Sequence, residues 1–183
     1  AIVAEGFEAG GHNGREETTT LCLIPAVREA TTLPLIAAGG IGTGEAIFAL
    51  MALGAEGVQM GTRFALTDES SASDIFKEYC LRLNEGDTKL LLKKLAPTRL
   101  VTNSFRDRVE AAEGRGASAE ELRELLGRGR AKKGIFEGDL EEGELEIGQV
   151  AALFRRRQSV DEVMKELLEG YRRASDKIRS AGL

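Results

Sequence analysis

The first 65 residues alternate between short apolar runs and segments whose apolar positions recur every three or four residues. Residues 2–4 and 35–38 are continuous apolar runs of the kind found in buried strands, and 57–62 form a third strand with its exit loop. Between them, residues 18–30 and 45–53 have the spacing of amphipathic helices. Because the connections are short, this order predicts a βαβαβ unit with parallel strands and right-handed crossovers.

From Ser70 onward the pattern becomes largely helical. Residues 71–84 and 106–114 have helical spacing, and 90–95 is a short apolar stretch. Ser118 and Ser159 each precede a glutamate by three residues, which is the capping-box signature of a helix start. The helix predicted after Ser159 has apolar residues at i, i+3, i+4, i+7, i+8 and i+11, the pattern of a strongly amphipathic helix.

Composition and charge exclude several classes of protein. Hydrophobic residues make up 42% of the chain and charged residues 30%, as in ordinary globular domains rather than disordered chains. No apolar run approaches the roughly 20 residues of a membrane span. The net charge is −5, opposite in sign to most duplex-binding domains, and the scarcity of aromatic residues argues against base stacking. We therefore expect neither nucleic acid nor a membrane as a partner.

The chain has two cysteines, Cys22 and Cys80, and a single histidine, His12. This set makes neither a disulfide framework nor a histidine-rich metal site, so no metal is expected. We interpret both cysteines as free buried thiols. Free thiols are typical of the reducing cytosol, and we expect a cytoplasmic protein.

Each predicted strand of the first part ends in a glycine-rich loop. The loop at 8–14 holds three glycines and His12, whose imidazole could transfer a proton or stabilise an anion near neutral pH. The loops at 37–41 and 59–63 offer backbone amides that could surround a phosphate. Because the carboxyl ends of parallel strands share one edge, the three loops should converge on one ligand. The alternative is that these glycines only form tight turns and that His12 has no catalytic role.

Taken together, these segments resemble the nitronate monooxygenase (2-nitropropane dioxygenase) family and its sister family, the FMN-dependent enoyl-acyl-carrier-protein reductases II. The matching segments follow the same order along the chain: 4–12, 34–41, 53–64, and 137–139 with 148–149. The resemblance implies an α/β fold: strands six to eight of a TIM (β/α)8 barrel that binds FMN at their carboxyl ends, plus a mostly helical substrate domain.

By this resemblance the chain has three parts. Residues 1–67 would be the C-terminal part of the FMN-binding barrel, and 68–145 a mainly helical substrate or lid domain. Residues 146–183 would be C-terminal helices packing back on the barrel. The sequence opens on a strand pattern without an initiator Met, so we expect it to begin within a larger fold. The missing N-terminal part of the barrel is then an expected partner, and a homodimer is a further one.

The family's functional residues map onto positions of this chain. His12 corresponds to the family histidine and is the candidate catalytic residue. The candidate cofactor-binding residues are Glu5, Gly10, Gly11, Gly39, Gly40, Gln59, Met60, Gly61 and Thr62. Many nitronate monooxygenases have Gln at the position of Glu5, and Asn13 replaces a common Arg or Ile, so the substrate stays open.

Three functional hypotheses follow. The first is an FMN-dependent monooxygenase that oxidises alkyl nitronates to carbonyl compounds and nitrite with O2. The second is an FMN-dependent enoyl reductase of fatty acid synthesis that uses NAD(P)H; the basic residues within 128–133 would then dock an acyl carrier protein. The third is a fragment without activity of its own, which aggregates or associates with the missing part because three strands cannot close a barrel.

Overall fold

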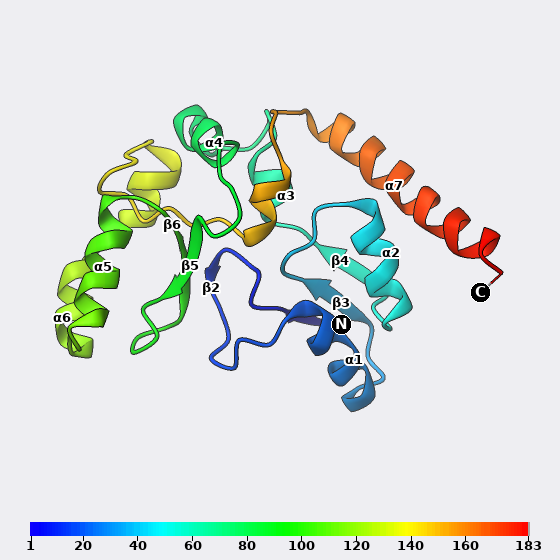
Figure 1. The fold of residues 1–183 in the computed structure, drawn as a ribbon, viewed down its shortest axis with the longest axis horizontal. Coiled ribbons are helices and arrows are strands. Elements are labelled where there is room, and N and C mark those ends of the chain that lie inside the picture. Colours follow the sequence, from blue (N-terminus) through cyan, green and yellow to red (C-terminus); the bar gives the residue numbers. More distant parts are fainter. Residues whose placement is uncertain (183) are drawn as a thin grey trace.

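The computed structural model describes residues 1–182 and contains two three-stranded sheets (Figure 1). The first sheet is parallel, with strand order β1-β3-β4. Its strands are β1 (Ile2–Glu5), β3 (Leu35–Ala38) and β4 (Gly57–Gln59), connected by helices α1 (Thr20–Ala30) and α2 (Gly44–Ala52). The βαβαβ unit predicted from the hydrophobic pattern is therefore confirmed.

The core of this unit forms where the strands meet the two helices. Ile24 of α1, Leu35 and Ala37 of β3, and Leu50 of α2 are almost completely buried. Of the apolar positions whose spacing predicts this helix, Ile24 is buried, whereas Leu21 is 65% exposed. Thr20 is buried together with Ile24.

The interpretation of both cysteines as buried thiols is wrong for Cys22, which lies on the exposed side of α1. Cys80 is buried, and this burial raises the pKa of its thiol to about 12. Neither cysteine forms a disulfide bond.

The second sheet is antiparallel and joins distant parts of the chain. Its order is β2-β6-β5, with β2 (Gly11–His12), β5 (Thr88–Leu91) and β6 (Thr98–Val101). The hydrophobic pattern does not predict this sheet. Two of its strands, β5 and β6, come from 68–145, the segment expected to be mainly helical. Because β2 belongs to 1–67, the sheet crosses the boundary expected at residue 67.

The other helices follow β4 along the chain. They are α3 (Thr62–Ala65), α4 (Asp74–Cys80), α5 (Ser104–Gly114), α6 (Ala119–Leu126), η1 (Lys132–Phe136), η2 (Gln149–Leu153) and α7 (Val160–Ser180). Both predicted capping boxes are formed, by Ser118 with Glu121 and by Ser159 with Glu162. The helix expected over 71–84 is shorter, because α4 occupies only its middle.

Helix α7 runs along α2 at one end of the molecule (Figure 1). Gly44 and Gly170 allow the two helices to approach closely, since a Cβ at Gly44 would lie 2.0 Å from the carbonyl oxygen of Leu167. The C-terminal helix is thus packed on the βαβαβ unit.

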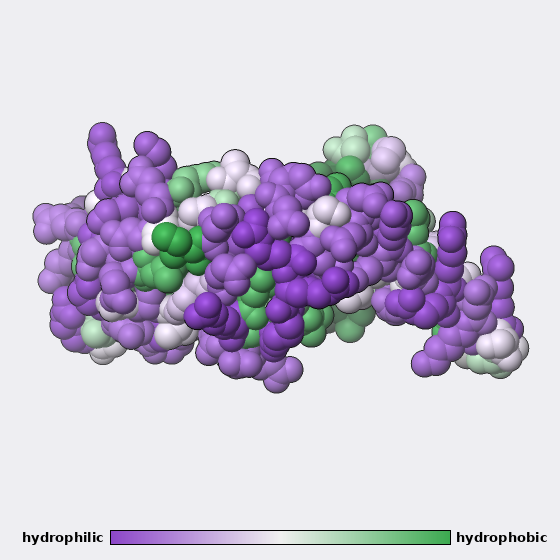
Figure 2. All heavy atoms as spheres, turned by 90° about the horizontal axis from the view of Figure 1, so that it is seen from above, coloured by the Kyte–Doolittle hydropathy of each residue, from purple (hydrophilic) through white to green (hydrophobic). Residues whose placement is uncertain are grey.

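Hydrophilic side chains cover most of the face seen in Figure 2, with apolar side chains between them. Among residues 1–182, no helix combines the length and the apolar character needed to cross a bilayer.

Candidate functional site

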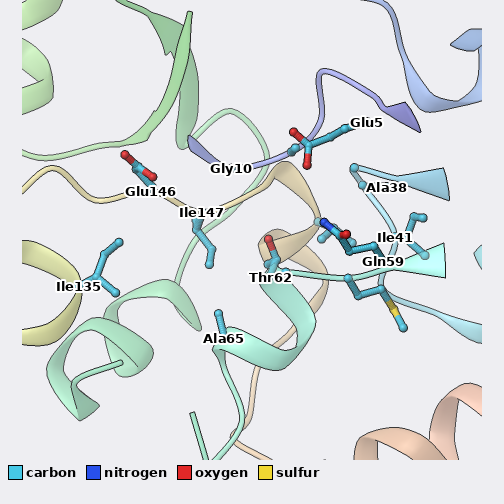
Figure 3. Close-up of a pocket in the computed structure, with 16 residues that line it drawn as sticks. Glu5, Gly10, Ala38, Ile41, Gln59, Thr62, Ala65, Ile135, Glu146 and Ile147 are labelled. Atoms are coloured by element: carbon cyan, nitrogen blue, oxygen red, sulfur yellow. The ribbon is translucent and has the colours of Figure 1, made fainter. Parts of the chain in front are cut away.

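A pocket of about 240 Å³ opens where the three parallel strands end (Figure 3). Among the residues that line it are Glu5, Gly10, Gly39, Gly40, Gln59, Met60, Gly61 and Thr62. The predicted convergence of the three glycine-rich loops is therefore observed. Of the nine candidate cofactor-binding residues only Gly11 is absent from the lining, and His12 is absent as well.

The glycines of the three loops differ in how much space a side chain would have at each position. At Gly39 a Cβ would lie 2.5 Å from the carbonyl oxygen of Gly6, and at Gly10 it would lie 2.4 Å from the backbone of Ile147. These two positions are glycine because protein backbones approach each other there. Gly61 differs: its φ is −86°, and a Cβ there would meet no atom within 4 Å. The side of Gly61 that a side chain would occupy is open space.

Helix α3 begins directly after Gly61, at the edge of the pocket. No side chain caps its N-terminus. The amides of Phe64 and Ala65 donate to the Gly61 carbonyl oxygen, so only the amides of Thr62 and Arg63 lack partners within the helix. The Thr62 hydroxyl accepts a hydrogen bond from the Gly148 amide at 2.9 Å. This bond holds the segment leading to η2 against the pocket.

The loop after β1 is fixed by two charged residues that the sequence analysis did not place in the site. Glu8 accepts hydrogen bonds from Thr20 at the start of α1. Arg99 of β6 is 2% exposed and donates to the carbonyl oxygens of Phe7, at 2.6 Å, and Ala9, at 3.1 Å. Arg99 stands between Thr98 and Leu100, and no pattern in the sequence marks it for this role.

His12 lies on β2, where it pairs with Thr98 of β6, and its side chain is exposed. The structure therefore places the candidate catalytic residue beside the pocket rather than in its wall. Glu146 lines the pocket, and a Cβ at Gly11, the residue before His12, would lie 2.6 Å from its Oε2. Burial raises the pKa of the Glu146 carboxyl, and the His12 charge lowers it.

Several pocket residues were missed by the sequence analysis: Ala65, Ile135, Glu146, Ile147 and Val150. Except for Ala65 of α3, they lie more than 100 residues beyond the first loop. The nearby Gly148 and Gln149, quoted for the family resemblance, were the only signal that this segment lies near the site.

Three of the basic residues within 128–133 form ion pairs with acidic residues of the same chain. Arg130 contacts Glu142 at 3.1 Å and lies over the Phe105 ring, while Lys132 and Lys133 form ion pairs with Glu137 and Asp139. This pairing reduces the charge available for docking an acidic carrier protein.

Within the described part of the chain, residues 1–182, no three His, Cys, Asp or Glu side chains are grouped so that they could hold a metal ion.

Comparison with known proteins gives consistent matches. The family model described as "Nitronate monooxygenase" matches residues 1–170. A "Probable nitronate monooxygenase" of Staphylococcus aureus (strain JH9) is 39% identical over 125 residues, which cover 62% of this chain and 35% of that protein.

Two solved structures are also similar. FabK from Thermotoga maritima is 35% identical with a TM-score of 0.91, and the match covers 98% of this chain and 57% of that one. Nitroalkane oxidase from Streptomyces ansochromogenes is 29% identical with a TM-score of 0.75, covering 97% of this chain and 53% of that one. The chain thus spans less than two thirds of the length of each of these relatives, and it shares their α/β fold.

Proposed function

Because the chain belongs to the nitronate monooxygenase family, whose members are flavin-dependent oxidoreductases, we propose that this protein binds FMN in the pocket at the ends of β1, β3 and β4. In this proposal the three strands are strands six to eight of a TIM barrel, and residues 68–145 cover the substrate side. Bound flavin would supply the redox chemistry, while the protein supplies binding, orientation and electrostatics.

The observation that carries the proposal is the open space at Gly61. It lies directly before the N-terminus of α3, and Gly61 lines the same pocket as Gly39 and Gly40. A phosphate fits such a place because backbone amides can donate to it. The lining contains no Lys, Arg or His, so these amides would carry the binding.

For the activity we propose oxidation of alkyl nitronates to carbonyl compounds and nitrite with O2. The matched family model and the Staphylococcus aureus relative support this choice. The role of His12 would be to stabilise the anionic substrate or to move its proton, from its place beside the pocket.

The second candidate is an enoyl reductase that takes NAD(P)H as co-substrate. The specific support for it is the greater structural similarity to FabK, with a TM-score of 0.91 against 0.75 for nitroalkane oxidase. The ion pairs of Arg130, Lys132 and Lys133 with acidic residues of the same chain weaken the docking site expected for this activity.

The visible spectrum of the protein as its gene encodes it, recorded without oxygen, separates these candidates. A flavin spectrum that bleaches with NADH or NADPH supports the reductase. A spectrum that persists with either nucleotide but changes with an alkyl nitronate supports the monooxygenase. No flavin after reconstitution would contradict both, and would agree with a fragment that lacks activity.

A further inference from the structure

A second cleft, of about 510 Å³, opens beside α3 where α7 runs along α2 (Figure 1). Ile41 and Thr62 line the pocket described above, whereas Gly42 and Arg63, the residues that follow them in the chain, line this cleft. Sites for small molecules have volumes of about 300–1,000 Å³, so the cleft is large enough for one.

The cleft differs from the first pocket in its charge. Its lining contains four arginines but only two carboxylates, whereas the lining of the first pocket has no Lys, Arg or His. The six charged residues are Arg63, Arg155, Arg156, Arg173, Glu45 and Glu166. This surplus of two positive charges occurs in a chain whose net charge is −5, so it is a local concentration of positive charge.

The Glu166 carboxylate is shared between two of the arginines. Its Oε2 accepts a hydrogen bond from Arg63 at 2.5 Å, and its Oε1 accepts one from Arg156 at 2.8 Å. The amide of Gln158 donates to the same Oε1 at 2.7 Å. One negative charge therefore serves two guanidinium groups, and it balances them only in part.

The other two arginines have different partners. Arg173 forms an ion pair with Glu45 at 3.1 Å. Arg155 donates to the backbone carbonyl oxygens of Leu83 and Phe154, which carry no net charge. The positive charge of Arg155 is thus available to an anion in the cleft.

Arg63 is the buried arginine of the set. It is 6% exposed, and its guanidinium carbon lies 4.4 Å from the centre of the Phe154 ring. Its Nε forms no hydrogen bond, a state that only Asn13 Oδ1 shares among the buried side-chain nitrogen and oxygen atoms of residues 1–182. A buried donor without an acceptor is costly, so such a group calls for a partner. Because Arg63 lines the cleft, a bound molecule can supply that acceptor.

We propose that this cleft binds a small phosphorylated molecule, with its phosphate oxygens on Arg155, Arg156 and Arg173 and with Arg63 as the buried donor. Guanidinium groups match phosphate oxygens in geometry and stay charged at every physiological pH. A diphosphate would neutralise the surplus of positive charge, and the volume leaves room for an organic group attached to it. The inference does not depend on flavin binding, because the pocket proposed for FMN is lined by other residues.

Calorimetric titration of the protein as its gene encodes it, with pyrophosphate as the probe, tests the arginine cluster. Arg156→Gln combined with Arg173→Gln changes two exposed side chains of the lining and should raise the dissociation constant about tenfold. The matched control combines Arg82→Gln with Arg172→Gln, which removes the same charge from exposed positions outside the lining and should change it less than about twofold. No binding of pyrophosphate to the wild type, or equal losses in the two double variants, would overturn the proposal.

Glu45→Gln gives a test in the opposite direction. It removes the carboxylate that pairs with Arg173, so the dissociation constant of pyrophosphate should fall about threefold, a gain that misfolding cannot produce. Weaker binding in this variant would contradict the role of Arg173.

Two further titrations separate this cleft from the first pocket and test the organic group. Gly61→Val changes only the first pocket and should bind pyrophosphate within about twofold of the wild type; loss of binding there would place the phosphate in the first pocket and overturn the proposal. ADP should bind more tightly than pyrophosphate if the remaining volume takes an organic group, and weaker binding would overturn that part. A protein that never binds FMN would end the proposed function and leave these outcomes unchanged.

Discussion

The Glu8 carboxylate accepts hydrogen bonds from the backbone amide of Thr20 at 3.0 and 3.1 Å and from the Thr20 hydroxyl at 3.0 Å. The same hydroxyl lies 2.8 Å from the carbonyl oxygen of Gly39. One residue pair thus ties the loop after β1, the start of α1 and the loop after β3 together at the pocket.

Glu8→Gln should lower the free energy of unfolding by about 1–2 kcal/mol, because hydrogen bonds to a charged acceptor become weaker neutral ones. The measurement is urea denaturation. Glu29→Gln on the exposed side of α1 is the matched control and should change the stability by less than about 0.5 kcal/mol. Equal stability of both variants would show that the Glu8 contacts contribute little.

Gly61→Val should abolish FMN binding while leaving the fold intact. Its φ of −86° suits any residue and no atom lies within 4 Å of the new Cβ, so the side chain would occupy only the space proposed for the phosphate. Absorbance of the purified protein at the flavin bands measures this. Gly114→Val, where a Cβ also meets no atom within 4 Å, is the control and should retain the flavin. Yellow Gly61→Val protein would show that the phosphate binds elsewhere.

His12→Ala should retain FMN and lower turnover about 100-fold, the usual contribution of one general acid or base. The flavin is expected to stay because His12 is exposed and does not line the pocket. Steady-state rates with an alkyl nitronate provide the measurement, and absorbance confirms equal flavin content. Wild-type turnover in His12→Ala would remove the imidazole from the mechanism.

Glu144 should make the protein less stable as the pH rises. Burial, followed by the nearby Glu146 charge, raises the pKa of the folded-state Glu144 carboxyl from 4.5 to about 7. Between these values the folded state binds more protons than the unfolded state, so the free energy of unfolding falls with rising pH, by about 2–3 kcal/mol for this group. In Glu144→Gln the free energy of unfolding, measured by urea denaturation between pH 4.5 and 7.5, should lack this decrease. Glu124→Gln, an exposed change on α6, should follow the wild type, and a wild-type slope in Glu144→Gln would contradict the assignment.

Arg99→Lys should destabilise the protein by about 2–4 kcal/mol, because an ammonium group cannot reproduce the forked donation to Phe7 and Ala9 from a buried position. Thermal and urea denaturation measure the loss. Arg82→Lys, at an exposed position, is the control with an expected change below about 0.5 kcal/mol. A small effect at Arg99 would mean that water or another donor satisfies the two carbonyl groups.

The parallel unit could be predicted because it contains continuous apolar runs such as Leu35–Ala38, which are typical of buried strands. Its helices show apolar residues every three or four positions. The antiparallel sheet could not be predicted. All four residues of β6 are buried, including Thr98 and Arg99, so the strand shows neither alternation nor a purely apolar run. Strand β2 is only two residues long and lies within a glycine-rich loop.

The pocket was predictable on the side of the glycine-rich loops and not on the other side. Glycines directly after strands mark the ends of a parallel sheet, and all the candidate cofactor residues except Gly11 line the pocket. Glu146 and Ile135 reach it through tertiary contacts across more than 100 residues, for which local spacing carries no signal. The pairing of β2 with β6, which holds His12 outside the pocket wall, depends on the same long-range contacts.

The pairing of β2 with β6 also has a mechanical consequence. His12 is carried by the antiparallel sheet through Thr98, and Glu146 is attached to the same sheet through Leu100. Gly39 and Gly61, by contrast, follow strands of the parallel sheet. A small displacement of one sheet against the other would therefore move the imidazole and the carboxyl group together relative to the glycine-rich loops. The distance from these two side chains to a bound ligand is thus set by how the two sheets are held together, and the loop after β1 is the connection between them.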